Sequence, residues 1–403
     1  MNEVKKYSIN FLLSILLILL SISVFNWLVN PYDIFLSPNI EGVNLYKSEV
    51  ERYTRLSKAY QIENIKPEVI FLASSRGLVF TDDMLADGDV SAMNLSLASG
   101  STYELYRMLQ HAHAVQPLKK VILAVDEVFS DTVQTSFSEE RLSVNVDGSI
   151  NGHRWLQKVQ DNFSSLFSID ALRASLRTLR KQGSSSTTSA HDASRVANAG
   201  GHRQMFNKME VSVFNKNKGE HQSCIDESSQ KGNAGKASIY FEEIVDFSYK
   251  KNIELIVYIS PSHARFYEIM CMTAQWPRIE AVKKHIVNTV EIKAKEYSSE
   301  PYIVWDFSGY NSITSENVPL KGDKLTLMKW YWEGSHYTRD TAAKIFGRMR
   351  ESTGASSDFG VIINADNIQH KIDADYMARE NYVRTDGDDL EELKNVMKLV
   401  NIK

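Results

Sequence analysis

Two short segments, far apart in the sequence, carry residues that could act together in nucleophilic catalysis. Ser74 and Ser75 follow the apolar run at 69–72 after one alanine, Ala73. Near the other end of the chain, Glu333 precedes His336 by three positions. Serine is a weak nucleophile unless a neighbouring imidazole accepts its proton and an acid orients that imidazole. A serine at the tip of a buried strand, combined with a distant acid-x-x-His pattern, predicts a serine hydrolase or acyltransferase.

Both segments also admit a plainer interpretation. Serine is a favoured N-cap residue, so Ser74 and Ser75 could simply begin the next helix, and Glu333 and His336 could be surface groups. The three consecutive aromatic residues at 330–332 favour a packed segment or a cleft over a solvated loop. We expect Glu333 to orient His336, His336 to face a serine, and residues 333–337 to open a helix that ends near 350.

The elements that must position these residues alternate between strand and helix. Short apolar runs predict strands at 68–73, 92–97, 120–125, 253–259 and 302–307, and amphipathic stretches predict helices at 103–114, 237–251, 279–297 and 338–350. Continuous apolar runs separated by helices are typical of a parallel sheet that is covered on both faces. The sequence therefore predicts a three-layer, doubly wound α/β domain over 67–352.

Two stretches interrupt or follow this alternation. Residues 130–236 contain no predicted strand and form an insertion, helical around 155–180 and partly disordered where serine and threonine dominate at 181–190. Such an insertion could be a lid, a substrate-binding surface or a tolerated surface loop. Residues 353–403 are predicted to form a C-terminal appendage with a docking helix, whose apolar positions are Leu390, Leu393, Met397 and Val400.

The N-terminus is predicted to anchor the chain in a membrane. Residues 11–29 form a nearly continuous apolar run that would span about 28 Å as a helix. Lys5 and Lys6 lie in the short segment 1–10, and no basic residue follows the run until Lys47, in the juxtamembrane segment 30–66. The positive-inside rule then places 1–10 in the cytoplasm and the rest in the periplasm, held by the inner membrane. A cleaved signal peptide is the alternative, although no small-x-small cleavage site follows the run.

Composition excludes some functions. The net charge is −4 and no basic stripe is present, so nucleic acid is not an expected partner. The two cysteines, Cys224 and Cys271, are compatible with one disulfide in an oxidising compartment. Their spacing from each other and from the histidines suggests no metal site, and we expect no cofactor.

The residues resemble the SGNH, or GDSL-type, hydrolase superfamily, and most closely its membrane-anchored, exported branch of polysaccharide O-acetylation proteins. Ala73-Ser74-Ser75 is similar to the first block of the family, which puts Ser75 at the nucleophile position, and Glu333-x-x-His336 is similar to the last block, Asp-x-x-His. The stretch 94–100, Asn-Leu-Ser-Leu-Ala-Ser-Gly, resembles the second block, and 121–126 occupies the place of the third.

The chain departs from the family pattern in ways that bear on catalysis. Glu333 replaces the usual aspartate, Ala73 replaces a glycine, and the Gly-x-Asn-Asp third block is missing. Asp126 takes that place, and an ionised carboxylate is a poor substitute for an oxyanion donor. Backbone donors near Ser75 and near Ser96 or Gly100 would then have to stabilise the oxyanion; losing one donor costs about 10²–10³ in rate.

The resemblance implies a serine esterase or O-acetyltransferase that acts on an exported or cell-surface glycan, with a membrane-bound O-acyltransferase as partner. Its catalytic residues would be Ser75, His336 and Glu333. A catalytically weak or inactive accessory protein with the same fold is the alternative. His263 and Asp306 follow the two later strands and are candidate substrate contacts, although a capping turn at His263 and a structural role for Asp306 are the competing interpretations.

Overall fold

The computed structural model describes residues 2–86, 88, 90–130, 132–182, 188–217, 238–350 and 357–401. It divides the chain into two compact units. Unit 1 comprises Met1–Lys66, Gln110–Gln116 and Thr135–His191, and unit 2 comprises Pro67–Leu109, Pro117–Gln134 and Asp192–Lys403. Of the stretch 181–190, which was expected to be partly disordered, residues 183–187 lie outside the described residues, and 188–190 instead begin a helix.

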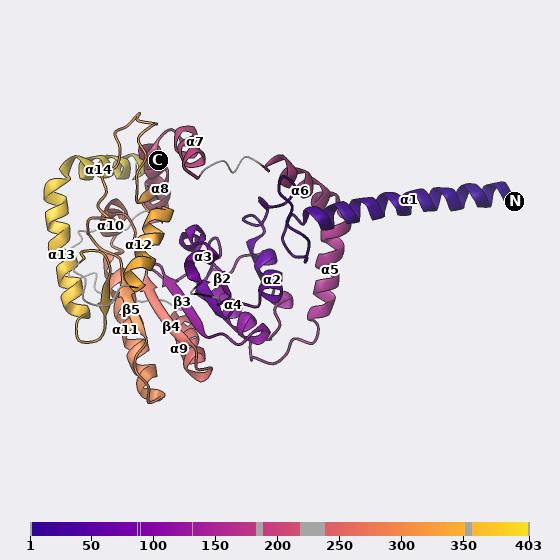
Figure 1. The fold of residues 1–403 in the computed structure, drawn as a ribbon. Coiled ribbons are helices and arrows are strands. Elements are labelled where there is room, and N and C mark those ends of the chain that lie inside the picture. The colour runs from indigo at the N-terminus through magenta and orange to yellow at the C-terminus, as the bar shows by residue number, and fades with distance from the viewer. Residues whose placement is uncertain are drawn as a thin grey trace. The chain divides into compact units, whose positions relative to one another are not determined.

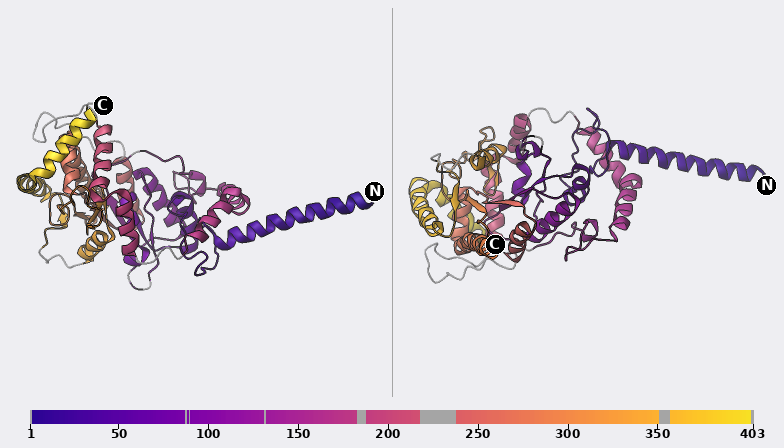
Figure 2. Two further views of the ribbon diagram at one scale, coloured as in Figure 1. Left: turned by 90° about the horizontal axis from the view of Figure 1, so that it is seen from above. Right: turned by 60° about the horizontal axis from the view of Figure 1, so that its bottom comes forward.

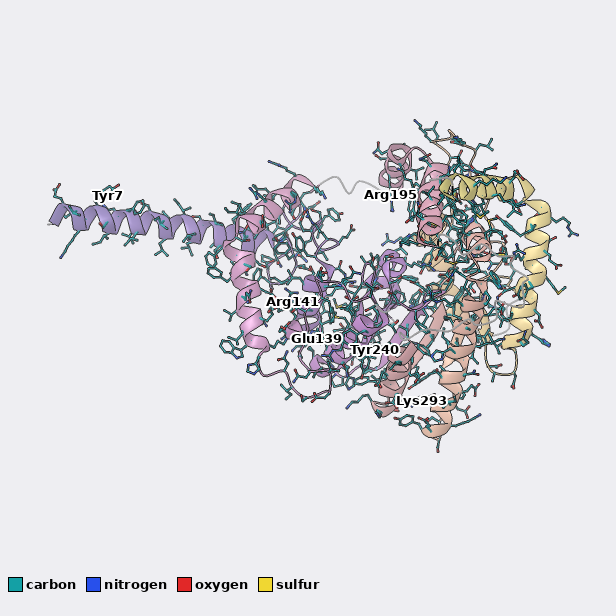
Figure 3. All side chains as sticks on the ribbon, turned by 180° about the vertical axis from the view of Figure 1, so that it is seen from behind. Tyr7, Glu139, Arg141, Arg195, Tyr240 and Lys293 are labelled. Carbon is teal, nitrogen blue, oxygen red and sulfur yellow. The ribbon has the colours of Figure 1, made fainter. Side chains whose placement is uncertain are left out.

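Unit 1 is helical. Its helices are α1 (Asn2–Val29), α2 (Thr54–Ile65), the short η2 (Glu139–Arg141), α5 (Arg154–Phe167) and α6 (Ile169–Arg180). In α1, the stretch Glu3–Val29 has a mean hydropathy of 2.5, so this one helix of the described chain is long and apolar enough to cross a membrane. Its side chains, Tyr7 among them, project freely along most of its length (Figure 3).

Unit 2 is built on a mixed, mostly parallel sheet of order β2-β1-β3-β4-β5-β8. Its strands are β1 (Val69–Leu72), β2 (Ala92–Asn94), β3 (Lys120–Val125), β4 (Glu254–Ile259), β5 (Ile303–Asp306) and β8 (Val361–Ile363). The first five strands pair in parallel, in register from Ile70 opposite Val121 to Ile259 opposite Asp306. All five coincide with predicted apolar runs: β3 has the predicted bounds, and the other four strands are shorter than expected.

Helices and one hairpin complete the described part of unit 2. They are η1 (Ser75–Val79), α3 (Asp82–Leu85), α4 (Thr102–Val115), α8 (His202–Lys216), α9 (Ser238–Lys250), α10 (Ala264–Met272), α11 (Trp276–Glu296), β6 (Tyr331–Glu333), β7 (His336–Tyr337), α12 (Arg339–Arg350), α13 (Ile368–Thr385) and α14 (Gly387–Asn401). The last turns of α4 belong to unit 1, and α7 (Thr188–Ala199) crosses the boundary between the units. Helices α9 and α11 lie side by side along the sheet (Figure 1).

The C-terminal segment is more than the predicted appendage. Residues 361–363 form β8, which pairs antiparallel with β5, so that Val304 lies opposite Ile363. Three residues are too short a run to predict as a strand, and an antiparallel edge strand cannot be read from a pattern of parallel ones. Helix α14 contains the predicted apolar positions, and Leu393 and Val400 are buried against α8 and α10.

The core of unit 2 is aromatic on the side of the sheet that carries the hairpin. Phe71 of β1 and Tyr258 of β4 stack at 6.1 Å between ring centroids, and Phe71 also contacts Phe80 and Phe346. Tyr331 and Tyr337 of the hairpin are members of the same buried cluster. The strands and the hairpin are therefore held in one core, although they come from opposite ends of the chain.

Candidate active site

The first serine segment forms a tight turn at the carboxyl end of β1. Ser74 caps the short helix η1, and its hydroxyl accepts from the backbone N–H of Arg76 at 3.4 Å. Ser75 is the first residue of η1 and is only partly buried. The capping interpretation therefore applies to Ser74, which caps η1, whereas the hydroxyl of the adjacent Ser75 can face another group.

Gly77 lets this turn approach its neighbours closely. A Cβ at this position would lie 2.2 Å from Ser96 Oγ and 2.4 Å from Ala73 Cβ. The Asn94 side chain fixes the same region, since its amide donates at 2.8 Å to the carbonyls of both Gly77 and Phe80. The second block of the sequence thus packs directly on the turn that carries Ser75.

The acid-x-x-His segment forms a β-hairpin. The prediction that residues 333–337 open a helix is therefore wrong. β6 and β7 pair antiparallel, with Tyr331 opposite Tyr337 and Glu333 opposite His336. Helix α12 begins only at Arg339. Tyr331, Trp332 and Tyr337 of the hairpin are buried, and its two-residue turn contains Gly334, where a Cβ would lie 2.1 Å from the end of the Met209 side chain.

The hairpin brings His336 to the serine turn. Ser75 Oγ lies 2.9 Å from His336 Nε2, and His336 Nδ1 makes a short contact with Glu333 Oε1. With the imidazole proton on Nδ1, that nitrogen donates to Glu333 and Nε2 is left to accept from the Ser75 hydroxyl. The predicted order of contacts, serine to histidine to acid, is present in the described structure.

Ser335, in the turn of the hairpin, was not predicted to take part. Its backbone N–H donates to Glu333 Oε2 at 2.9 Å, its hydroxyl donates to Oε1 at 2.8 Å, and the same hydroxyl lies 3.0 Å from His336 Nδ1. Burial alone would raise the pKa of Glu333, but the contacts with His336 and Ser335 outweigh it and lower that pKa. The carboxylate is thus held ionised and in one orientation.

Two buried histidines support the hairpin from behind. His202 donates from Nδ1 to the carbonyl of Trp332 at 3.1 Å, and its Nε2 accepts from the N–H of Met328. The backbone N–H of His263 donates to the Gly334 carbonyl at 2.9 Å. Both side chains lie under the hairpin and set the position of the turn that carries Ser335.

His263 is a structural residue and does not face a substrate. It is 1 % exposed and caps α10: Nδ1 accepts from the N–H of Arg265 at 3.2 Å, and Nε2 donates to the carbonyl of Glu316 at 2.6 Å. Burial lowers the pKa of His263 to about 4, so the ring is neutral at pH 7. The capping turn, which was the alternative in the sequence, is the interpretation that the structure supports.

Asp306 also has a structural role. Its carboxylate is buried and pairs with Lys283 at 2.8 Å, and it accepts from the hydroxyl and the N–H of Ser308. Burial opposes ionisation, yet Lys283 and Lys371 hold the pKa of Asp306 well below its usual range. Asp306 therefore joins β5 to α11 and is not available to a substrate.

Asp126, at the end of β3, faces Arg76, the cation next to Ser75. Arg76 Nε lies 3.6 Å from Asp126 Oδ1, and Arg76 Nη1 lies 2.7 Å from the buried Glu127. Arg76 thus forms a salt bridge to this edge of the sheet. Arg76 offsets one of the two negative charges of Asp126 and Glu127, so the net negative charge beside Ser75 is smaller than the two carboxylates alone would give.

The two backbone donors expected from the second block are already engaged. The N–H of Ser96 donates to Asn94 Oδ1 at 2.8 Å, and the N–H of Gly100 donates to the carbonyl of Leu97 at 2.8 Å. Ser75 begins η1, so its own N–H has no acceptor inside that turn. In this conformation the oxyanion donor that remains from the predicted set is the N–H of Ser75.

His336 and Glu333 lie at an accessible edge. The side chain of His336 is 42 % exposed and that of Glu333 is 13 % exposed. A small cavity of about 30 Å³ lies beside the serine turn, where Ser74, Gly100 and Asp126 are among its lining residues. Within the described ranges, no cluster of three acidic, histidine or cysteine side chains could hold a metal ion.

Cys271, the one cysteine among the described residues, adds no reactive group to this site. Cys271 is buried in α10 and disulfide-bonded, whereas Cys224 lies outside the described residues.

No model of a known protein family matches the chain, and a search of curated proteins found no relative.

Proposed function

We propose that this protein is a membrane-anchored serine esterase or O-acyltransferase that acts on an exported or cell-surface glycan. The observation that carries the proposal is the chain of contacts from Ser75 Oγ to His336 Nε2, 2.9 Å apart, and from His336 Nδ1 to Glu333. A serine, an imidazole and a carboxylate in this order are what a serine nucleophile requires.

The chemistry follows from these contacts. Ser75 Oγ attacks an acyl carbonyl, most simply an acetyl ester, while its proton passes to His336 Nε2. The tetrahedral intermediate collapses to an acyl-serine, and His336 returns the proton to the departing alkoxide. A sugar hydroxyl or water, deprotonated by His336, then attacks the acyl-serine and releases Ser75. Glu333 stabilises the imidazolium that exists only during each transfer.

The strand order supports a three-layer SGNH-like fold for unit 2. The parallel strands run 2-1-3-4-5, and in this order the crevice between the first and third strands binds ligands at their carboxyl ends. Ser75 follows β1 and Asp126 follows β3, so both lie at that crevice. The resemblance of the sequence blocks and the strand order thus favour the same family.

The membrane and glycan parts of the proposal rest on α1 and on the resemblance. Lys5 and Lys6 precede the apolar part of α1, which favours a cytoplasmic N-terminus and a periplasmic catalytic unit at the inner membrane. The open position of His336 suits a bulky acyl acceptor or donor such as a polysaccharide. A membrane-bound O-acyltransferase is the partner that the resemblance implies.

One observation favours the second candidate, an accessory protein with little or no activity. The amides of Ser96 and Gly100 are committed to other acceptors, and the third-block asparagine is missing. Such a protein would bind a glycan or an acyltransferase with the same surface. It would keep the Ser75–His336 contact without turnover.

Fluorophosphonate labelling of the full-length purified protein tests the proposal. We expect the wild type and Ser74→Ala to be labelled and Ser75→Ala to be unlabelled, because the probe reacts with a base-activated serine. Hydrolysis of an acetyl ester by the same three proteins should follow the same order. Equal labelling of wild type and Ser75→Ala would reject Ser75 as nucleophile, and labelling without turnover would favour the accessory protein.

The topology has its own test. A fusion of alkaline phosphatase after residue 40 should be active, because the enzyme needs an oxidising compartment. An inactive phosphatase, together with a fluorescent cytoplasmic reporter that works at the same position, would reverse the proposed orientation.

A further inference from the structure

Helix α5 is amphipathic, and its polar face is turned towards the rest of unit 1. Asp161 is 8 % exposed and accepts from Tyr60 at 2.8 Å and from the guanidinium of Arg141. Arg154 lies two helical turns before Asp161 and pairs with Glu63 of α2. A surface helix of a soluble domain normally buries its apolar face, so the orientation of α5 is the reverse of the usual one.

The apolar face of α5 is correspondingly exposed. Trp155, Leu156, Val159 and Phe163 lie at helical spacing, and their exposed fractions are 61, 51, 59 and 64 %. Contiguous apolar surface of this kind marks an interaction site. Four large side chains on one face are too many to attribute to chance exposure of single residues.

Helix α6 repeats the arrangement. Its buried positions are small or polar, and Ala171 and Ala174 pack on Tyr60 in the core of unit 1. Its large residues Ile169 and Leu176 are exposed at 68 and 41 %. Helices α5 and α6 are in contact, and their exposed apolar residues are here called the apolar platform: Trp155, Leu156, Val159, Phe163, Ile169 and Leu176.

The platform adjoins the end of α1. The side chain of Asn26, buried in the last turn of α1, donates to the carbonyl of Leu166 in α5 and accepts from the hydroxyl of Ser175 in α6. Helix α5 runs across α1 and not alongside it, on the side of unit 1 from which α1 projects (Figures 1 and 2). If α1 crosses a bilayer along its normal, α5 lies parallel to the bilayer surface.

We propose that the apolar platform inserts into the interface of the bilayer that α1 crosses. The occupant is the headgroup and upper acyl region of the lipid, where amphipathic helices lie in the membrane plane with their apolar face immersed by about 5–10 Å. The inference rests on the proposed membrane span of α1. Direct continuity with that span favours lipid over a second copy of the chain or a protein partner.

The length of α1 agrees with this placement. Residues up to Ser21 are exposed on all sides, and burial against unit 1 begins with Ile22. The apolar stretch from Tyr7 to Val24 would cover about 27 Å, close to the hydrocarbon thickness. The last turn of α1, with Asn26 and Trp27, then lies at the interface, at the level of the platform, where tryptophan is favoured.

Site-directed spin labelling of the full-length chain in lipid nanodiscs tests the inference. Single labels are placed through Val159→Cys and Phe163→Cys on the platform, Leu16→Cys within the span, and Met377→Cys on exposed α13 of unit 2. Wild-type protein carried through the same labelling gives the background from the native cysteines, and circular dichroism checks that each variant is folded. The measurement is relaxation of each label by oxygen, which partitions into lipid, and by a water-soluble nickel complex.

We expect the ratio of oxygen to nickel relaxation at Val159 and Phe163 to be several-fold higher than at Met377 and lower than at Leu16. Nickel access at both platform positions equal to that at Met377 would overturn the inference. Shielding of both labels from both reagents would also overturn it, because that result means a protein cover such as a second copy. Nickel access at Leu16 would reject the span itself, and so both this inference and the membrane part of the proposed function.

Discussion

At the scale of single residues, the site is an arrangement in which each group limits the freedom of the next. Ser74 caps η1 so that Ser75 can face His336, and Ser335 binds both oxygens of Glu333 so that the carboxylate can meet the imidazole. The extra methylene of Glu333, compared with the aspartate of the family it resembles, is accommodated because the acid and the histidine lie on adjacent strands of a hairpin.

The first prediction concerns Glu333. We expect Glu333→Gln to lower kcat on an acetyl ester by about 10²–10⁴-fold with little change in KM, because the carboxylate stabilises an imidazolium that forms only during attack. Glu333→Asp should retain substantial activity. Glu296→Gln, an exposed position on α11, is the matched control. If folded Glu333→Gln turns over like wild type, Glu333 has no part in catalysis.

The second prediction concerns Gly77, two residues after the nucleophile. In Gly77→Ala the new Cβ would lie 2.2 Å from Ser96 Oγ, so the turn that carries Ser75 must shift. We expect a loss of stability of about 1–3 kcal/mol and a marked fall in turnover. Gly347→Ala in α12 is the control, since no atom lies within 4 Å of its added Cβ. Thermal melts and turnover of both variants check the prediction, which unchanged values for Gly77→Ala would contradict.

The sequence allowed Ser75, Glu333 and His336 to be predicted, because the chemistry of a nucleophile demands those residue types in that order. Ser335 could not be predicted, since a serine in a turn has no pattern of its own. His263 and Asp306 were candidates because they follow strands, but whether such a residue faces a crevice or the core depends on packing between distant elements. Both side chains are buried, so neither contacts a substrate.

At the scale of elements, a hairpin takes the place of the expected helix start. Helical and strand patterns are hard to separate over five residues. The pairing of Tyr331 with Tyr337 across the hairpin is evident only from the structure. The hairpin is held by the ring of His202, which donates to the Trp332 carbonyl, and by the backbone N–H of His263, which donates to the Gly334 carbonyl. Both rings are neutral, because each accepts with one nitrogen and donates with the other.

The third prediction follows from the neutral state of His263. Its pKa falls from 6.5 to about 4 on folding, so between these values the unfolded chain binds a proton that the folded chain does not. Stability should therefore decrease as pH falls from about 6.5 to 4, by up to about 3 kcal/mol from this group. Thermal melts across that range should show a smaller decrease for His263→Asn, which can cap α10 without titrating.

The pH range from 7 to 8 supplies the internal control for that experiment, because His263 is neutral there in both states. Wild type and His263→Asn should then differ by a constant amount. An identical decrease of both proteins between pH 6.5 and 4 would show that His263 does not carry the proton linkage.

At the scale of the whole molecule, the C-terminal segment is tied to the sheet by buried charge as well as by β8. Lys283 of α11 lies between Asp306 at the end of β5 and Asp375 of α13, at 2.8 and 2.9 Å. Arg265 of α10 similarly meets Glu210 of α8 and Asp389 of α14. The parallel part of the fold was predictable from apolar runs, whereas these ties join polar residues with no periodic signal.

The fourth prediction tests the tie at Lys283. Without Lys283, the buried carboxylates of Asp306 and Asp375 share Lys371 as their one remaining cation in the described structure, so one buried negative charge is left without compensation. Lys283→Met should therefore destabilise the fold by about 3–5 kcal/mol. Lys284→Met, at the next position and partly exposed, should change stability by less than about 0.5 kcal/mol. Chemical denaturation of the two variants compares them directly, and equal midpoints would show that the buried pair contributes nothing.

The contact between Ser75 and His336 joins residues 261 positions apart. At about 5–20 residues per second, a ribosome needs about 13–50 s to make that stretch of chain. During this interval Ser75 already exists but lacks its base and the hairpin that carries it. A nascent or prematurely terminated chain would therefore carry Ser75 without the imidazole that contacts it, so that the proposed acyl transfer would begin only once most of the protein has been synthesised and has folded.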